Sequence, residues 1–193
     1  MKLEAMQALL QASLPAKRYE HSVAVYETAL QLAHAHGLPE KKIAVAALLH
    51  DCGREVPTKE SVAKAQELGI KLKKVEIAQP ILLHAILGVP YAKNKYGVKD
   101  PEILDAIRYH TTGNKDMSAT AMVVFLADMI EPARDFPGVE ELRELCYQDL
   151  KQAMLLAYSN TIKYLLKQGL LIHPDCIKGY NQLQLEQIEQ QAK

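Results

Sequence analysis

The sequence predicts an all-α fold, and three observations support this prediction. Apolar residues recur at three- and four-residue spacing along most of the chain, which is the period of an amphipathic helix. Capping residues and prolines stand at the starts of these segments, and glycines stand near their ends. Apolar–polar alternation never coincides with a hairpin turn pair, so no strand is expected. The 193 residues suffice for one core and fall short of what two domains usually need.

The first half of the chain predicts three helices. Residues 1–14 form an amphipathic helix that carries charges. Residues 21–37 form the next helix, which ends at Gly37. Its inward stripe consists of His21, Val25, Ala29 and Leu32. The third helix opens at Pro39 with an acidic residue in its first turn, and it ends at Asp51.

The second half repeats these signals. Asp100 caps a helix that has Pro101 at its first position, and a serine cap opens another helix that stops near Pro132. Residues 139–168 carry one long helical pattern. The final helix follows His173, and the helical signals are weakest over residues 89–101. Typical helix lengths then predict about eight or nine helices in a single bundle.

Composition excludes several classes of protein. The 23 basic and 23 acidic residues give a formal net charge of zero, and no stretch is basic enough for a nucleic-acid footprint. No apolar run approaches the length of a membrane span, and the N-terminus is not a signal peptide. The three cysteines are widely spaced and odd in number, as expected for free thiols in a reducing compartment. We therefore expect a cytoplasmic protein without nucleic-acid or membrane partners.

Five helical segments each place a histidine or an aspartate on the face that is expected to be buried. These residues are His21, His50 with Asp51 beside it, His84, His110 and Asp128. Taken singly, each histidine is best interpreted as a core residue with satisfied hydrogen bonds. Taken together, imidazoles and carboxylates that converge in a core are the ligands of a transition-metal site. The absence of cysteine from the set favours a hydrolytic site over structural zinc.

The motifs that carry these residues are KRYEHSVAV, AALLHDCGRE, LLHAILG, IRYHTTG, LADMIEPARDFPGVEELR and LIHPDCIKGYN. Their order resembles that of the HD-domain metal-dependent phosphohydrolases, and more narrowly the YqeK family within them. The matching stretches extend over most of residues 17–181. The resemblance implies one all-α HD phosphohydrolase domain over residues 1–193. Its metal-site core would span about 17–135, and helices at about 138–191 would complete the core and the pocket.

The resemblance also implies an activity. Members of that family are similar in function to symmetrical diadenosine tetraphosphate hydrolases, in which a metal-bound hydroxide attacks and two ADP are released. The implied cofactor is a divalent transition metal, with iron as the expected element and one or two ions per chain. The implied partner is the nucleotide, and a homodimer is left open.

The roles that the resemblance implies are assigned residue by residue. The implied metal ligands are His21, His50, Asp51 and Asp128, with His84 and His110 serving a second metal or the phosphates. The implied catalytic residues are Asp51, His84 and His110. The implied substrate contacts are His21, Ala24, His84, His110, Thr111, Arg134 and His173. A surface ion pair between Arg134 and Glu131 is the alternative interpretation of that arginine.

Two other functions remain open at this point. One is an HD-type phosphohydrolase that acts on nucleoside monophosphates or on guanosine polyphosphate alarmones. The other is a regulatory protein that binds metal or nucleotide without turnover. The intact set of expected ligands disfavours the second.

Overall fold

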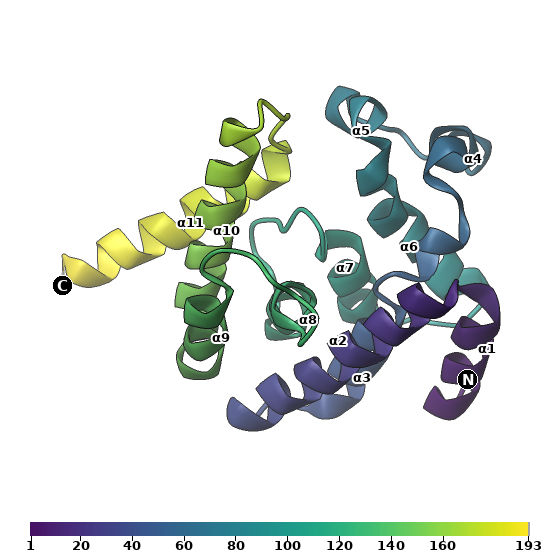
Figure 1. The fold of residues 1–193 in the computed structure, drawn as a ribbon, viewed down its shortest axis with the longest axis horizontal. Coiled ribbons are helices and arrows are strands. Elements are labelled where there is room, and N and C mark those ends of the chain that lie inside the picture. Colours follow the sequence, from purple (N-terminus) through teal and green to yellow (C-terminus); the bar gives the residue numbers. More distant parts are fainter. Residues whose placement is uncertain (193) are drawn as a thin grey trace.

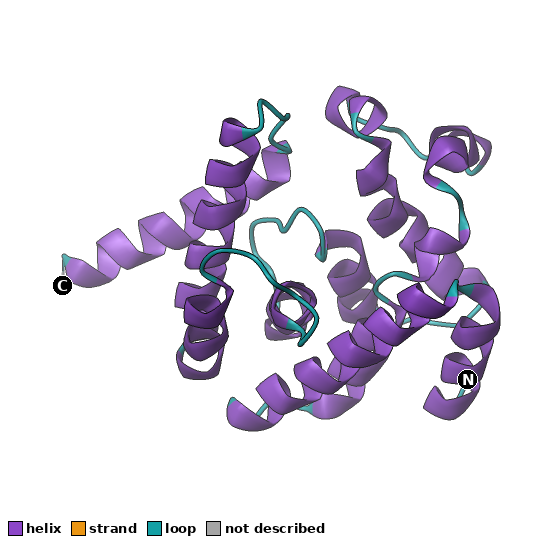
Figure 2. Cartoon of the chain, in the orientation of Figure 1, coloured by secondary structure: helices purple, strands orange, loops and turns teal. Residues whose placement is uncertain are grey.

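The computed structural model describes residues 1–192, which form helices joined by loops (Figures 1 and 2). The α-helices are α1 (Leu3–Ser13), α2 (Ala16–Ala35), α3 (Glu40–Leu49), α4 (Ser61–Glu67), α5 (Lys74–Ala78), α6 (Leu83–Asn94), α7 (Pro101–Tyr109), α8 (Ala119–Ile130), α9 (Val139–Gln148), α10 (Leu150–Lys167) and α11 (Pro174–Gln191). The short 3₁₀ helices are η1 (Cys52–Glu55), η2 (Thr58–Glu60) and η3 (Pro80–Leu82). No strand occurs within residues 1–192, so the all-α prediction is confirmed.

Four helices form the centre of the molecule. Helices α2, α3, α7 and α8 pack against one another, and α8 is seen end-on near the middle of Figure 1. Helix α6 packs against α7 and η1, while α9 and α10 cover α8 from the other side. The contacts are made by fully buried apolar side chains such as Leu32, Leu49, Ile107 and Leu126. The packing of α2, α3, α7 and α8 therefore brings the ends of four separate sequence segments into one core.

The expected start signals are confirmed at two central helices. The Asp100 carboxylate accepts a hydrogen bond from the Glu102 backbone N–H (2.9 Å) and caps α7. The Ser118 hydroxyl accepts one from the Ala121 backbone N–H (3.2 Å) and caps α8. Each cap satisfies a backbone donor that the first turn of a helix leaves without a partner.

The long helical pattern over 139–168 is divided between two helices. The chain is extended at Asp149, with φ −152° and ψ 111°, and this residue separates α9 from α10. Its carboxylate accepts hydrogen bonds from the backbone N–H groups of Lys151 and Gln152. An aspartate side chain can accept hydrogen bonds from the free N–H groups at the start of a helix. This arrangement favours a helix N-terminus at the aspartate over a continuous helix through it.

The helix count was also too low. Residues 1–192 contain eleven α-helices, whereas about eight or nine were expected. Helices α4 and α5 have seven and five residues, which is too short for a 3.6-residue period to be recognised. Helix α6 runs into residues 89–101, where the helical signals of the sequence are weakest, and contains Pro90.

None of the helices described in residues 1–192 combines the length and the hydropathy that a membrane crossing requires.

Candidate metal centre

The centre of the site is the pair His50 and Asp51, at the point where α3 ends and η1 begins. Both side chains are almost completely buried, with 0% and 2% of their surface exposed. The Arg54 guanidinium offsets the charge of Asp51, because its Nε donates to both carboxylate oxygens at 2.8 and 2.9 Å. Arg18 contributes a second positive charge 3.5 Å from the same carboxylate. The buried carboxylate is thus compensated from two elements.

Four residues meet this pair, and we refer to all six as the His–Asp cluster. They are His21, His50, Asp51, His84, His110 and Asp128. Helices α2 and α8 supply the first and last of them, His50 and Asp51 follow α3, α6 supplies His84, and His110 ends α7. The prediction that five segments direct a histidine or aspartate to one place is therefore confirmed as a matter of geometry.

Three histidines of the cluster are oriented in the same way. In each ring Nδ1 donates to the backbone carbonyl three residues earlier. The bonds are His50 to Ala47 (2.7 Å), His84 to Ile81 (2.5 Å) and His110 to Ile107 (2.8 Å). With Nδ1 protonated, the lone pair of a neutral imidazole lies on Nε2. All three Nε2 atoms face the other members of the cluster, as a metal-binding histidine requires.

His21 is oriented by a carboxylate. Its Nδ1 lies 3.2 Å from Glu131 Oε1, and its Nε2 lies 3.0 Å from Asp128 Oδ1. A carboxylate behind a ligating histidine is a common partner that fixes the ring and increases its basicity. His21 therefore presents Nε2 to the cluster, like the other three rings.

The nitrogen atoms of the cluster approach one another closely. His84 Nε2 lies 3.0 Å from His110 Nε2, and His21 Nε2 lies 3.3 Å from His50 Nε2. Asp51 Oδ1 lies 3.3 Å from His84 Nε2. Lone pairs that face each other at such distances repel unless a proton or a metal ion is shared between them. The donor arrangement therefore fits bound cations.

The cluster contains three overlapping groups of donor residues, and within each group the donor atoms lie within 4.8 Å of one another. They are His21–His50–Asp51, His50–His110–Asp128 and Asp51–His84–His110. Imidazole nitrogens with carboxylate oxygens suit divalent transition metals. Asp51 belongs to two of these groups, so the residues present fit two neighbouring ions that share this carboxylate.

The pKa values of the buried histidines favour the neutral, metal-binding form. Burial lowers the pKa of His50 to about 4 and that of His84 to about 3. Burial would raise the pKa of Asp128, but the hydrogen bond with His21 and the neighbouring imidazoles and Arg134 hold it well below its usual range. Burial would lower the pKa of His21, but Asp128 raises it above the ordinary value. Burial would likewise raise the pKa of Asp51, but His110 and the other neighbouring imidazoles hold it well below its usual range. At neutral pH the carboxylates of Asp51 and Asp128 are therefore ionised, and His50 and His84 are neutral.

Arg134 and Thr111 lie at the edge of the cluster. Arg134 donates to the carboxylate of Asp128 and to its backbone carbonyl, the latter at 2.7 Å. Arg134 Nε also lies 3.6 Å from Glu131 Oε1, so the alternative pairing occurs within the site and not on a remote surface. The Thr111 hydroxyl lies 3.1 Å from His84 Nε2. Both residues are placed where a ligand of the cluster would meet them.

His173 is not brought to the cluster. Its Nε2 lies 3.3 Å from Glu76 Oε1, and its Nδ1 accepts a hydrogen bond from the Asp175 backbone N–H at the start of α11. Arg108 donates to the same Glu76 oxygen at 3.2 Å. His173 is only 3% exposed, and its ring nitrogens contact Glu76 of α5 and the backbone at the start of α11. Its role as a substrate contact stays a prediction.

One further expectation concerns Ala24 of α2, and two arginines near the cluster were not expected. Ala24 is half-buried one turn after His21, and its small side chain stays a predicted ligand contact. Sequence reasoning missed Arg18 and Arg54. The signal was their spacing, because each lies three residues from a member of the cluster, which is about one helical turn.

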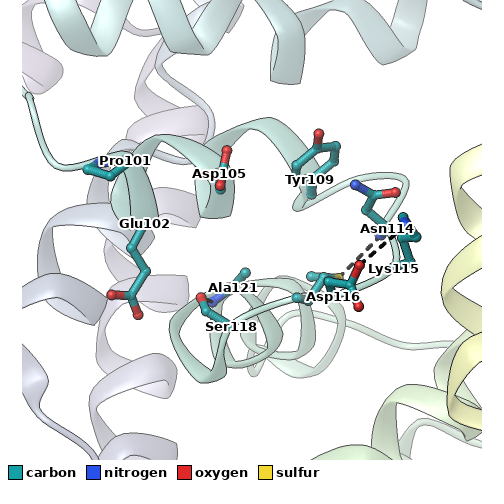
Figure 3. A pocket seen from close by; sticks show the side chains of 10 residues that line it. Pro101, Glu102, Asp105, Tyr109, Asn114, Lys115, Asp116, Ser118 and Ala121 are labelled. Carbon is teal, nitrogen blue, oxygen red and sulfur yellow. Dashed lines mark hydrogen bonds and ion pairs between the residues drawn. The ribbon is translucent and has the colours of Figure 1, made fainter.

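A cavity of about 450 Å³ lies apart from the cluster, between α7 and residues 114–121 (Figure 3). Its lining contains the carboxylates of Glu102, Asp105 and Asp116 and none of the clustered histidines. Lys42 pairs with Glu102 at 2.7 Å. The acidic lining would repel phosphate groups, so this cavity is not a candidate for a nucleotide.

Comparison with known proteins identifies the family. The family model described as "HD domain" matches residues 18–133, which contain all six residues of the His–Asp cluster. The chain belongs to the HD-domain family. A solved structure from Clostridium acetobutylicum, titled as a "predicted HD superfamily hydrolase involved in NAD metabolism", has the same fold. Its TM-score is 0.91 at 34% identity, covering 96% of this chain and 98% of that one.

Curated relatives of this HD-domain chain share one name. The proteins of Halalkalibacterium halodurans, Bacillus subtilis and Staphylococcus aureus are each named "Bis(5'-nucleosyl)-tetraphosphatase, symmetrical". They are 40%, 37% and 32% identical to this chain. The matches cover 93%, 95% and 94% of this chain and 95%, 98% and 95% of the relatives.

Proposed function

We propose that this HD-domain chain is a metal-dependent symmetrical bis(5'-nucleosyl)-tetraphosphatase, an acid-anhydride hydrolase that converts diadenosine tetraphosphate into two ADP. The observation that supports the proposal best is the complete His–Asp cluster in a chain with relatives of that name over nearly its full length. The alternative regulatory function without turnover would be favoured by a missing ligand, and the six expected ligands are all present.

The cluster would hold one or two divalent transition metals, with iron as the proposed element. His21, His50, Asp51 and Asp128 would hold the first ion, and His84 and His110 would hold a second that shares Asp51. When bound, such an ion lowers the pKa of water and polarises a phosphoryl oxygen. The protein holds the ligands in place through backbone carbonyls and Glu131, so little reorganisation is needed when a ligand arrives.

The charge balance supports an anionic substrate. Three carboxylates lie in or behind the cluster, and three arginines pair with them. The carboxylates are those of Asp51, Asp128 and Glu131, and the arginines are Arg18, Arg54 and Arg134. Since these charges cancel, the full positive charge of each metal ion is available to phosphate oxygens. Arg134 and Thr111 are the proposed phosphate contacts.

Other aspects of the proposal rest on the sequence. We place the protein in the cytoplasm, treat residues 1–193 as one domain and keep Ala24 as a substrate contact. The packing of α9 and α10 on α8 agrees with a single folding unit. A homodimer stays a proposal that the molar mass in solution tests.

The test of function is product analysis with protein purified without oxygen. Diadenosine tetraphosphate should give ADP as the only nucleotide product, and metal analysis of the same sample should detect a transition metal. AMP and ATP in equal amounts would contradict symmetrical cleavage. Turnover of nucleoside monophosphates or guanosine polyphosphates, with none of the dinucleotide, would favour the other class of HD phosphohydrolase.

A further inference from the structure

A cavity of about 300 Å³ opens directly beside the His–Asp cluster, on the side of Asp51 and His84. His84 belongs to both, because its Nε2 faces Asp51 at 3.3 Å while the residue also lines the cavity. The volume lies at the lower end of the range for pockets that hold small ligands. A molecule bound at the cluster could therefore extend into this cavity past His84.

Two arginines line the cavity where it meets the cluster. Arg54 uses Nε for Asp51 and directs Nη2 to His84 at 3.3 Å. Arg18 reaches Asp51 through Nη1 at 3.5 Å, and its side chain is 46% exposed. A guanidinium has five N–H groups, so donors of both residues are left for other acceptors. Arginine pairs of this kind match the oxygens of phosphate groups.

The rest of the lining suits a nucleoside. Pro57, Pro80 and Ile81 form an apolar part, and Ile81 leaves 50% of its surface exposed. Thr58 supplies an exposed hydroxyl group at the same cavity, whereas the buried Ser61 hydroxyl donates to the Thr58 backbone carbonyl at 2.7 Å. Apolar surface for a base, a hydroxyl for a ribose and arginines for phosphates therefore occur together in the lining of one cavity.

The positive charges lie at two ends of the cluster. Arg134 pairs with Asp128, whereas Arg18 and Arg54 pair with Asp51. A molecule with a phosphate chain across the cluster would meet arginine on both sides. Resting on the proposed function, we propose that the Arg18–Arg54 cavity binds one of the two nucleoside diphosphate halves of a dinucleoside polyphosphate. The other half would then lie on the Arg134 side.

The first test measures binding of ADP by titration calorimetry to protein as purified. The wild-type chain should bind two ADP molecules, and Thr58→Trp, which fills the cavity from its exposed edge, should bind one. Arg18→Ala should weaken one of the two binding events about tenfold or more, as expected for a lost charge-assisted hydrogen bond. Lys59→Ala is the matched control, because Lys59 is 83% exposed in the same segment and does not line the cavity.

The second test compares diadenosine tetraphosphate with adenosine 5′-tetraphosphate, which lacks the second nucleoside. Wild-type kcat/KM should favour the dinucleotide, and both Thr58→Trp and Arg18→Ala should reduce that preference about tenfold. Two ADP per chain together with an unchanged preference in both variants would overturn the cavity proposal. A wild-type protein that releases no ADP from the dinucleotide would instead overturn the proposed function, and the binding stoichiometry would still decide the cavity.

Discussion

The Nε2 atoms of His84 and His110 lie 3.0 Å apart, and each ring has its other nitrogen on a backbone carbonyl. Two neutral imidazoles held in this way direct their lone pairs at the same point. Asp51 Oδ1 lies 3.3 Å and 3.7 Å from the two Nε2 atoms, so the three groups together form one set of ligands. This set shares Asp51 with the His21–His50–Asp51 group.

His84→Ala and His110→Ala should therefore each lower the metal content of anaerobically purified protein by about one ion per chain, as expected when one of two sites loses a ligand. Elemental analysis gives the content, and His34→Ala serves as an exposed control. Unchanged metal content with only a higher KM for the nucleotide would mean that the two histidines contact substrate and hold no second ion.

His50→Ala and Asp51→Ala should abolish both hydrolysis and metal binding while the chain stays helical. Both residues lie at the centre of the cluster, and Asp51 belongs to two of its donor groups. Circular dichroism and elemental analysis check the two halves of this prediction. Asp51→Asn keeps the shape of the side chain beside Arg54, so it separates loss of a ligand from loss of packing. Near-normal metal content and rate in all three variants would contradict the assignment of the site.

The metal-free protein should lose stability as the pH falls from about 6.5 towards 4. Burial lowers the pKa of His50 to about 4 and of His84 to about 3, from an ordinary value of 6.5. In that window the unfolded chain binds protons that the folded chain excludes, so the free energy of unfolding decreases. The raised pKa of His21 increases stability as the pH falls, but the lowered pKa values of His50 and His84 act against it.

Thermal unfolding in the presence of a chelator checks this pH dependence. His50→Gln should flatten the decline of Tm between pH 6.5 and 4, and His34→Gln should leave it as in the wild type. A His50→Gln profile identical to that of the wild type would show that His50 is not the source of the effect.

Gly113→Ala should destabilise the protein more than Gly37→Ala. Both glycines have a left-handed φ, +60° and +59°, and such a φ costs an alanine about 1–2 kcal/mol. A Cβ on Gly113 would also lie 2.1 Å from the Tyr158 hydroxyl, whereas one on Gly37 would meet nothing within 4 Å. Overpacking should add about 1–3 kcal/mol at Gly113. Chemical denaturation of the two variants measures the difference, and equal losses would contradict the close contact with Tyr158.

Local patterns predicted where the cluster residues lie because each of them stands on a helix or directly after one. The three- and four-residue spacing places His21 and Asp128 on faces that tertiary packing then buries. Arg54 was missed because its contact with Asp51 depends on the 3₁₀ turn of η1. A turn of four residues is too short to give a recognisable apolar period. His173 is buried as its apolar surroundings suggest, but its partner Glu76 lies 97 residues away. That pairing depends on where the fold places α5, and the residues around His173 carry no information about this placement.

Two histidines of the cluster are oriented by the helices that they follow. His50 and His110 follow the last residues of α3 and α7, and their rings bond to carbonyls of the final turns. A single residue inserted into either helix would turn the ligand by about 100° and advance it by about 1.5 Å. Length variation in this protein should therefore be tolerated in loops and rejected in α3 and α7, however well a longer helix would pack.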